Sequence, residues 1–337
     1  MKMMMSLPAM MIAGAACAED LAGFAEMTLD VPHHGRTVQG AYWYPAVGGG
    51  AEVLYGDNPV FVGTSVLEDA DIAEGQFPVV LMSHGLGGNI RTLSWLTAGL
   101  AAKGAVVVSL NHPNCSTGDF ELRAGLDHWT RVLDLQVAID ALEVDPRFSG
   151  RLDMSRVMAA GFSYGGWTAL SMGGLTGDLM GYADHCAEHG SASIHCTDIA
   201  RGGVDLATLD ENLWNAAYAD AGISMVAAID PALHWGLDAE NAAGLVDNVQ
   251  VIVLGGEADR LFATDIFASG FDAYLTDAEI TEIVPANHFS ALLPCKPAGP
   301  AILAEEGEPP ICNDPNGALR ADIHARIIGQ IAKQLGL

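Results

Sequence analysis

Basic residues are scarce in this sequence of 337 residues. It has 15 lysines and arginines against 42 aspartates and glutamates, which gives a formal net charge of −27. A surface of this sign repels the phosphates of nucleic acids and of anionic lipids. We therefore expect no nucleic-acid partner, and we look instead for a site that takes a small molecule.

Long apolar runs are also missing, except at the amino terminus. Residues 1–18, MKMMMSLPAMMIAGAACA, combine a lysine, an apolar stretch and an A-C-A site before Glu19, which is the pattern of a secretory signal peptide. The alternative is a lipoprotein signal with lipid on Cys17, which Gly14 disfavours because a larger aliphatic residue is expected there. We expect a periplasmic or secreted chain with no integral membrane segment after signal removal.

Cysteine is limited to six residues, one of which lies in the predicted signal. In an oxidising compartment the other five are expected to make two local bridges, Cys186–Cys196 and Cys295–Cys312, and to leave Cys115 over. The sequence does not fix this pairing. In a reducing compartment all five would be free thiols.

Apolar runs of strand length alternate with segments of helix length over most of the chain. Nearly continuous apolar strands predict a mostly parallel sheet covered by helices on both faces, as one domain over residues 19–337. The Gly- and acid-rich residues 47–75 are predicted as a long surface loop. Residues 173–222 contain no buried strand, and we interpret them as an insertion above the strand ends that roofs the site. Strands are predicted within 77–85, 105–113, 155–163, 223–231, 248–259 and 279–289, and helices within 95–104, 131–145, 163–174 and 319–335.

The segment VMAAGFSYGG, residues 157–166, places a serine between glycines at the end of a buried strand. Gly161, Ser163 and Gly165 fill a G-x-S-x-G pattern, in which a tight turn lifts the serine clear of the sheet. The following helix directs its unpaired N–H groups and dipole at the region where an oxyanion forms. Ser163 is the predicted nucleophile.

A serine nucleophile needs a base and an orienting carboxylate, which in this arrangement follow it along the chain. His288, in ANHFS, comes after the last predicted strand and is the predicted base. Two carboxylates compete for the third role. Asp259 closes VIVLGGEAD and Asp230 closes MVAAID, one strand earlier. We favour Asp259, because the acid usually follows the penultimate strand.

The loop HGLGG, residues 84–88, follows an earlier buried strand, and its glycines allow backbone N–H groups to turn inward. We predict an oxyanion hole made of the backbone amides of Leu86 and Tyr164. A phosphate-cradling loop is the alternative for HGLGG alone, but no Walker lysine follows it. Two such elements, each after a buried strand, indicate an acyl-transfer site.

The stretch SHGLGGNIRTLSWLTAGLAAKGAVVVSLNHPN, followed by GFSYGG, resembles the platelet-activating-factor acetylhydrolase family and the related bacterial group of predicted dienelactone hydrolases. The similarity runs from about Trp43 to His288. It implies an α/β-hydrolase fold, a Ser-Asp-His triad, no metal or other cofactor, and hydrolysis of carboxylic esters. True dienelactone hydrolases use a cysteine nucleophile, so Ser163 favours ordinary esters.

Carried over residue by residue, the resemblance supports Ser163 and His288, with the Leu86 and Tyr164 amides as oxyanion donors. It is divided on the acid. The acetylhydrolases resemble this chain at Asp230, whereas bacterial relatives and polyester hydrolases resemble it at Asp259.

Three functions remain open at this point. The first is hydrolysis of small carboxylic esters, the second is hydrolysis of polyesters, phthalate esters or amides by the same residues, and the third is a non-catalytic binding protein. A histidine- and cysteine-rich piece, residues 184–196, has a spacing that fits no common zinc finger. We interpret it as a disulfide-linked segment. The oligomeric state is left open.

Overall fold

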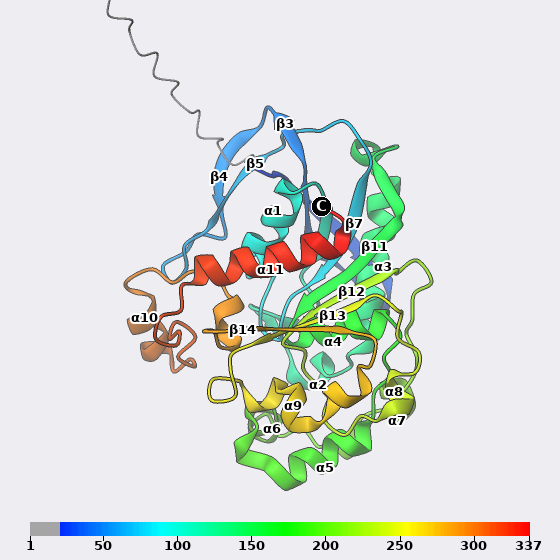
Figure 1. Ribbon diagram of the computed structural model, residues 1–337, viewed down its shortest axis with the longest axis vertical. Coiled ribbons are helices and arrows are strands. Elements are labelled where there is room, and N and C mark those ends of the chain that lie inside the picture. Colours follow the sequence, from blue (N-terminus) through cyan, green and yellow to red (C-terminus); the bar gives the residue numbers. More distant parts are fainter. Residues whose placement is uncertain (1–20) are drawn as a thin grey trace, which may run out of the picture.

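The computed structural model describes residues 21–337 and is built on one ten-stranded sheet (Figure 1). The predicted signal peptide, residues 1–18, lies outside the described residues. Within them, no helix is both long and apolar enough to cross a membrane. In spatial order the strands are β14 (Glu279–Ile283), β13 (Val249–Leu254), β12 (Met225–Ile229), β11 (Leu152–Phe162), β7 (Phe77–Ser83), β8 (Val106–Leu110), β2 (Arg36–Tyr44), β1 (Gly23–Val31), β5 (Thr64–Glu68) and β4 (Ala51–Tyr55).

The strands from β8 to β14 pair in parallel, and the amino-terminal strands add antiparallel pairs at the other side of the sheet. All residues of β8 and β12 are buried, as expected for strands covered on both faces. This confirms the predicted mostly parallel sheet.

Alternate residues of the central strands feed two separate hydrophobic cores. In β11, Val157 and Ala159 pack into one core, and Met158 and Ala160 into the other. The first core is covered by α3 (Trp129–Val144) and α4 (Tyr164–Met172), and the second by α1 (Ser94–Ala102) and α11 (Arg320–Leu335). The sheet is therefore a middle layer between helices, as Figure 1 shows.

Residues 173–222 contribute no strand to the described sheet, and they form α5 (Leu179–His189), α6 (Ile194–Arg201), α7 (Glu211–Trp214) and short 3-10 turns. A disulfide joins Cys186 in α5 to Cys196 in α6. A second disulfide, Cys295–Cys312, brackets α10 (Gly299–Glu306), and Cys115 is a buried free thiol. Both predicted bridges are confirmed. The remaining short helices are α2 (Leu122–Gly125), α8 (Ala239–Ala242) and α9 (Ile266–Ser269).

The prediction of a surface loop over residues 47–75 is wrong. This stretch contains β4 and β5, which pair with each other in the main sheet, and β6 (Asp71–Ile72), which pairs with β3 (Ala46–Gly48). The three glycines at 48–50 all have positive φ and turn the chain into β4. Alternate side chains then reach the core, with Val66 fully buried. Two-stranded pairs β9 (Cys115–Ser116) and β10 (Asp119–Phe120) complete the strands described.

Candidate active site

Ser163 stands at the turn between β11 and α4 with φ 57° and ψ −117°, a region that non-glycine residues rarely occupy. A Cβ atom on Gly161 would collide with the backbone of Gly165, and one on Gly165 would collide with the carbonyl of Ser83. Larger residues therefore cannot stand at either glycine without moving the backbone. This is the steric reason for the G-x-S-x-G pattern, and the predicted turn is confirmed.

A buried carboxylate–imidazole pair lies at the ends of neighbouring strands. His288 Nδ1 is 3.0 Å from Asp230 Oδ2, and both side chains are buried. Since a carboxylate only accepts hydrogen bonds, Nδ1 carries the proton and Nε2 is left as a base. The other carboxylate oxygen accepts a 2.7 Å hydrogen bond from the Leu254 amide. Burial raises the pKa of Asp230, and the hydrogen bond from His288 acts in the opposite direction.

The carboxylate beside His288 is thus Asp230 and not Asp259, which corrects our preference from the sequence. Asp259 is exposed, and its amide donates to Gly256 in a turn beyond β13. Asp230 directly follows β12, and its positive φ of 43° turns it back toward the sheet, where its amide donates to Ile252. Both aspartates follow buried strands, so the sequence pattern alone does not separate them.

Ser163 and His288 are both hydrogen-bonded to the segment around Asp230. The Ser163 amide donates to the carbonyl of Ile229 at 2.8 Å, and its carbonyl accepts from Ala232 at 3.1 Å, so the serine is fixed to the residues on either side of Asp230. The ring of Phe162 lies 4.6 Å from the His288 ring, measured between centroids. Within the described residues no hydrogen bond joins Ser163 to His288; such bonds often tighten only when substrate binds.

The two predicted oxyanion donors also lie beside the serine. Leu86 and Tyr164 line the same pocket as Ser163, and the Cβ position of Gly85 is 3.4 Å from the Ser163 Cβ. Tyr164 is the first residue of α4, so its N–H has no partner within the helix. In the part of the chain that the structure describes, the Leu86 N–H has no protein acceptor, whereas the next amide, that of Gly87, donates to Cys115.

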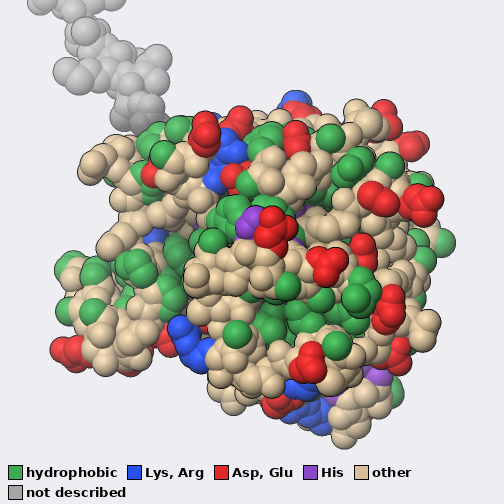
Figure 2. Space-filling view, turned by 90° about the horizontal axis from the view of Figure 1, so that it is seen from below, with side chains coloured by type: hydrophobic (Ala, Val, Ile, Leu, Met, Phe, Trp, Pro, Cys, Tyr) green, Lys and Arg blue, Asp and Glu red, His purple; other side chains and the backbone are tan. Residues whose placement is uncertain are grey.

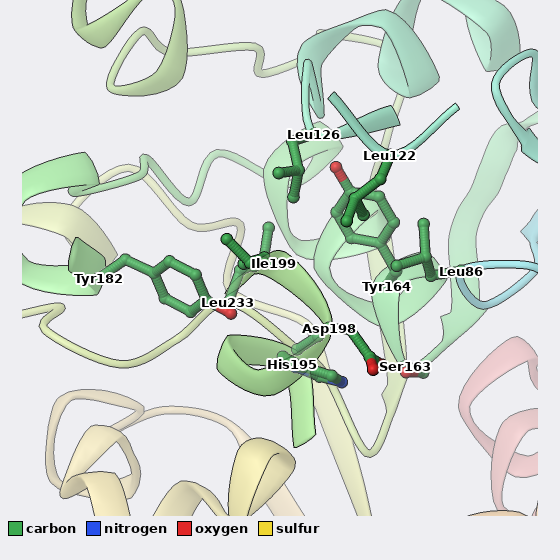
Figure 3. Close-up of a pocket in the computed structure, with 11 residues that line it drawn as sticks. Leu86, Leu122, Leu126, Ser163, Tyr164, Tyr182, His195, Asp198, Ile199 and Leu233 are labelled. Carbon is green, nitrogen blue, oxygen red and sulfur yellow. The ribbon is translucent and has the colours of Figure 1, made fainter. Parts of the chain in front are cut away.

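A small, largely apolar pocket of about 40 Å³ opens next to Ser163 (Figure 3). Its walls come from two sources: the core domain and the insertion at 173–222. The core domain contributes Leu86, Leu122, Leu126, Tyr164, Ala232 and Leu233, and the insertion contributes Tyr182, His195, Asp198 and Ile199.

The imidazole of His195 points toward the Ser163 hydroxyl (Figure 3). Burial, together with the smaller effect of the neighbouring histidines, among them His288, lowers the pKa of His195 to about 3, so the ring is neutral at pH 7. We interpreted this segment only as a disulfide-linked piece and missed the role of His195 in the pocket. The one available signal was its place beside Cys196, whose disulfide fastens α6 to α5.

A buried arginine contacts the residues around the start of the HGLGG loop. Arg131, in α3, donates to the Ser83 hydroxyl and the Thr168 hydroxyl, each at 3.0 Å, and to the carbonyl of His84. Its guanidinium also lies 4.6 Å from the centre of the Tyr164 ring. These contacts connect the strand end before HGLGG to the helix that begins at Tyr164, so Arg131 links the two segments that carry the predicted oxyanion donors.

These features together define an α/β-hydrolase fold. A model of the family described as "Platelet-activating factor acetylhydrolase, isoform II" matches residues 62–119, which include the HGLGG loop but neither Ser163 nor His288. The chain thus has an α/β-hydrolase fold and resembles this acetylhydrolase family over that segment. A comparison with curated proteins found no match.

Among solved structures, a ferulic acid esterase from Streptomyces cinnamoneus is similar with a TM-score of 0.59 and 16% identity, over 96% of this chain and 91% of that one. An acylaminoacyl peptidase from Pyrococcus horikoshii has a TM-score of 0.46 and 10% identity, over 80% of this chain and 38% of its own. A putative dipeptidyl aminopeptidase IV from Bacteroides ovatus has a TM-score of 0.44 and 12% identity, over 80% and 33%. The esterase similarity supports the fold assignment.

Proposed function

We propose that this chain is a serine hydrolase that cleaves carboxylic esters through an acyl-enzyme. One observation carries the proposal: the strained Ser163 turn is fixed by backbone hydrogen bonds to the residues that flank Asp230, and Asp230 holds His288. A nucleophile, a base with a fixed tautomer and its orienting carboxylate are thus held at one edge of the sheet. The resemblance to the acetylhydrolase family over residues 62–119 supports an ester substrate.

In the proposed reaction, Ser163 Oγ attacks the ester carbonyl while its proton passes to His288 Nε2. The Leu86 and Tyr164 amides stabilise the oxyanion of the tetrahedral intermediate. The intermediate collapses as the C–O ester bond breaks, and His288 gives the proton to the departing alcohol. Water then attacks the acyl-enzyme, with His288 taking its proton and returning it to Ser163 Oγ as the acid leaves. Asp230 stays ionised and stabilises the imidazolium.

The pocket favours an apolar acyl or aryl group. Most of its lining is aliphatic or aromatic, and Asp198 adds a carboxylate. On the face seen in Figure 2, acidic side chains are spread over the surface and basic ones are few. With a net charge of −27, we expect neutral or weakly polar esters to bind well and anionic esters to be captured slowly at low salt.

The insertion at 173–222 is proposed to roof the site and set the chain-length preference, since α5 and α6 contribute four residues to the pocket wall. Replacing the insertion by a short linker should broaden or abolish the acyl-chain preference. An unchanged substrate profile in the folded deletion variant would refute this role. We also propose that the chain is periplasmic or secreted, which the two disulfides support.

Hydrolysis of aryl esters, acetyl phospholipids, phthalate or terephthalate esters and aryl amides tests the proposal. Wild-type chain should hydrolyse at least one ester class, and Ser163→Ala should lose that activity while keeping the melting temperature. Preference for phthalates or amides would support the second candidate function. No hydrolysis of any class by folded protein would favour a non-catalytic binding protein.

A further inference from the structure

Two adjacent histidines and a buried aspartate converge away from the proposed active site. His33 and His34 belong to a 3-10 turn (Pro32–His34) between β1 and β2, and Asp134 belongs to α3. His33 Nε2 donates a 2.9 Å hydrogen bond to Asp134 Oδ1, and His34 Nε2 lies 3.3 Å from the same oxygen. All three atoms are within 4.8 Å of one another, although about a hundred residues separate the turn from the aspartate.

The His34 nitrogen is buried and has no hydrogen-bond partner in the described residues. Its side chain is 10% exposed, and its Nε2 lies at ion-pair distance, 3.3 Å, from Asp134 Oδ1. A buried nitrogen without a partner costs free energy. His34 Nε2 and Asp134 Oδ1 are thus close to each other without a hydrogen bond between them, as two ligand atoms of one metal ion would be.

The second carboxylate oxygen of Asp134, Oδ2, already accepts a hydrogen bond. His112 Nδ1 is 2.7 Å from Asp134 Oδ2, and His112 Nε2 is 3.0 Å from the Ser83 hydroxyl. A ligating carboxylate is commonly oriented by such an outer hydrogen bond. The nearby Arg131 forms no salt bridge with Asp134 in the described residues, since its hydrogen bonds go to Ser83, His84 and Thr168.

We propose that His33, His34 and Asp134 bind a divalent transition metal, with Zn²⁺ the best-suited ion. Imidazole nitrogens and a carboxylate oxygen are typical zinc ligands. At metal–ligand distances of about 2.0–2.2 Å, neighbouring ligands in a tetrahedral or octahedral shell are about 3.0–3.5 Å apart. The 3.3 Å separation falls in this range, and the 2.9 Å separation, which is a hydrogen bond in this structure, lies just below it. The His33 side chain is 22% exposed, so it offers an entry path and leaves room for water as a further ligand.

Bound metal would fasten the β1–β2 turn to α3. It would also act on the loop before the oxyanion hole, because the His112 amide donates to His84 Nε2 at 3.1 Å. The site is therefore a structural one that supports the proposed active site without contacting substrate. It is independent of whether the substrate is an ester.

Isothermal titration of tag-free, chelator-treated chain with ZnCl₂ tests the proposal. We expect one equivalent to bind with a micromolar or lower Kd and to raise the melting temperature. The double variant His33→Gln/His34→Gln should weaken binding at least 100-fold and lose the thermal shift. The matched control is His189→Gln, in the other histidine-rich part of the chain, which should bind as the wild type does.

CoCl₂ supplies a readout that thermal stability alone does not. Titration should produce visible absorption bands of a nitrogen- and oxygen-ligated site, and these bands should vanish in the double variant while its far-UV circular dichroism is unchanged. Absence of saturable binding to wild type would overturn the proposal. Binding that survives the double variant, or that is lost in His189→Gln, would also overturn it by placing the metal elsewhere.

Discussion

The choice between Asp230 and Asp259 gives the sharpest prediction about the proposed mechanism. Asp230→Asn replaces the acceptor of the 3.0 Å hydrogen bond to His288 by an amide of nearly the same shape. The amide NH₂ would donate to Nδ1, so the imidazole would carry its proton on Nε2 and could not accept the proton of Ser163. The corresponding change in serine proteases lowers turnover by ~10⁴, and we expect a loss of similar size here.

This loss corresponds to ~5 kcal/mol of transition-state stabilisation, at 1.36 kcal/mol for each factor of ten. Asp259→Asn is the matched control, because that carboxylate is exposed and makes no hydrogen bond to His288 in the described residues. It should keep kcat within about twofold. Turnover of a chromogenic aryl ester, with the melting temperature of each variant measured in parallel, provides the assay. A large loss in Asp259→Asn together with an active Asp230→Asn would refute the reasoning.

Three further predictions concern stability. Burial lowers the pKa of His128 to about 4, so below pH ~6.5 the unfolded chain binds more protons than the folded chain. This group should therefore lower the free energy of unfolding by up to ~3 kcal/mol between pH ~6.5 and ~4, as measured by urea denaturation. A pH-independent free energy of unfolding over this range would contradict the prediction. Gly165→Ala should lower stability by more than about 1–3 kcal/mol and reduce ester turnover, because its Cβ meets backbone. The control Gly329→Ala, on an open helical surface, should be neutral or stabilising, and equal melting temperatures for the two variants would refute the steric argument. Cys186→Ala/Cys196→Ala should cost about 2–3 kcal/mol in reversible denaturation and raise KM for esters; unchanged kinetics would show that the bridge does not position α6.

The sheet and the serine turn could be predicted because local sequence determines them. Buried parallel strands need continuous apolar runs, and the turn around Ser163 admits no Cβ at Gly161 or Gly165. The disulfide partners are close in sequence, at separations of 10 and 17 residues, so proximity identified them.

Three features could not be predicted from local sequence, because they depend on how distant segments of the chain meet. They are the carboxylate beside His288, the position of His195 in the pocket, and the His33–His34–Asp134 cluster. Asp230 and Asp259 differ only in which turn folds back toward the sheet. His195 reaches the pocket through the path of the insertion. The strands within residues 47–75 were not predicted, because the glycine- and acid-rich composition of this stretch is more typical of loops.

The central claim is that Ser163 is a nucleophile activated by the Asp230–His288 pair, and labelling with a fluorophosphonate probe tests it most directly. Mass spectrometry of labelled chain should show one adduct, located on Ser163 by peptide mapping, and labelling should slow strongly in His288→Ala. Folded wild-type protein whose Ser163 stays unlabelled under the same conditions would contradict the account.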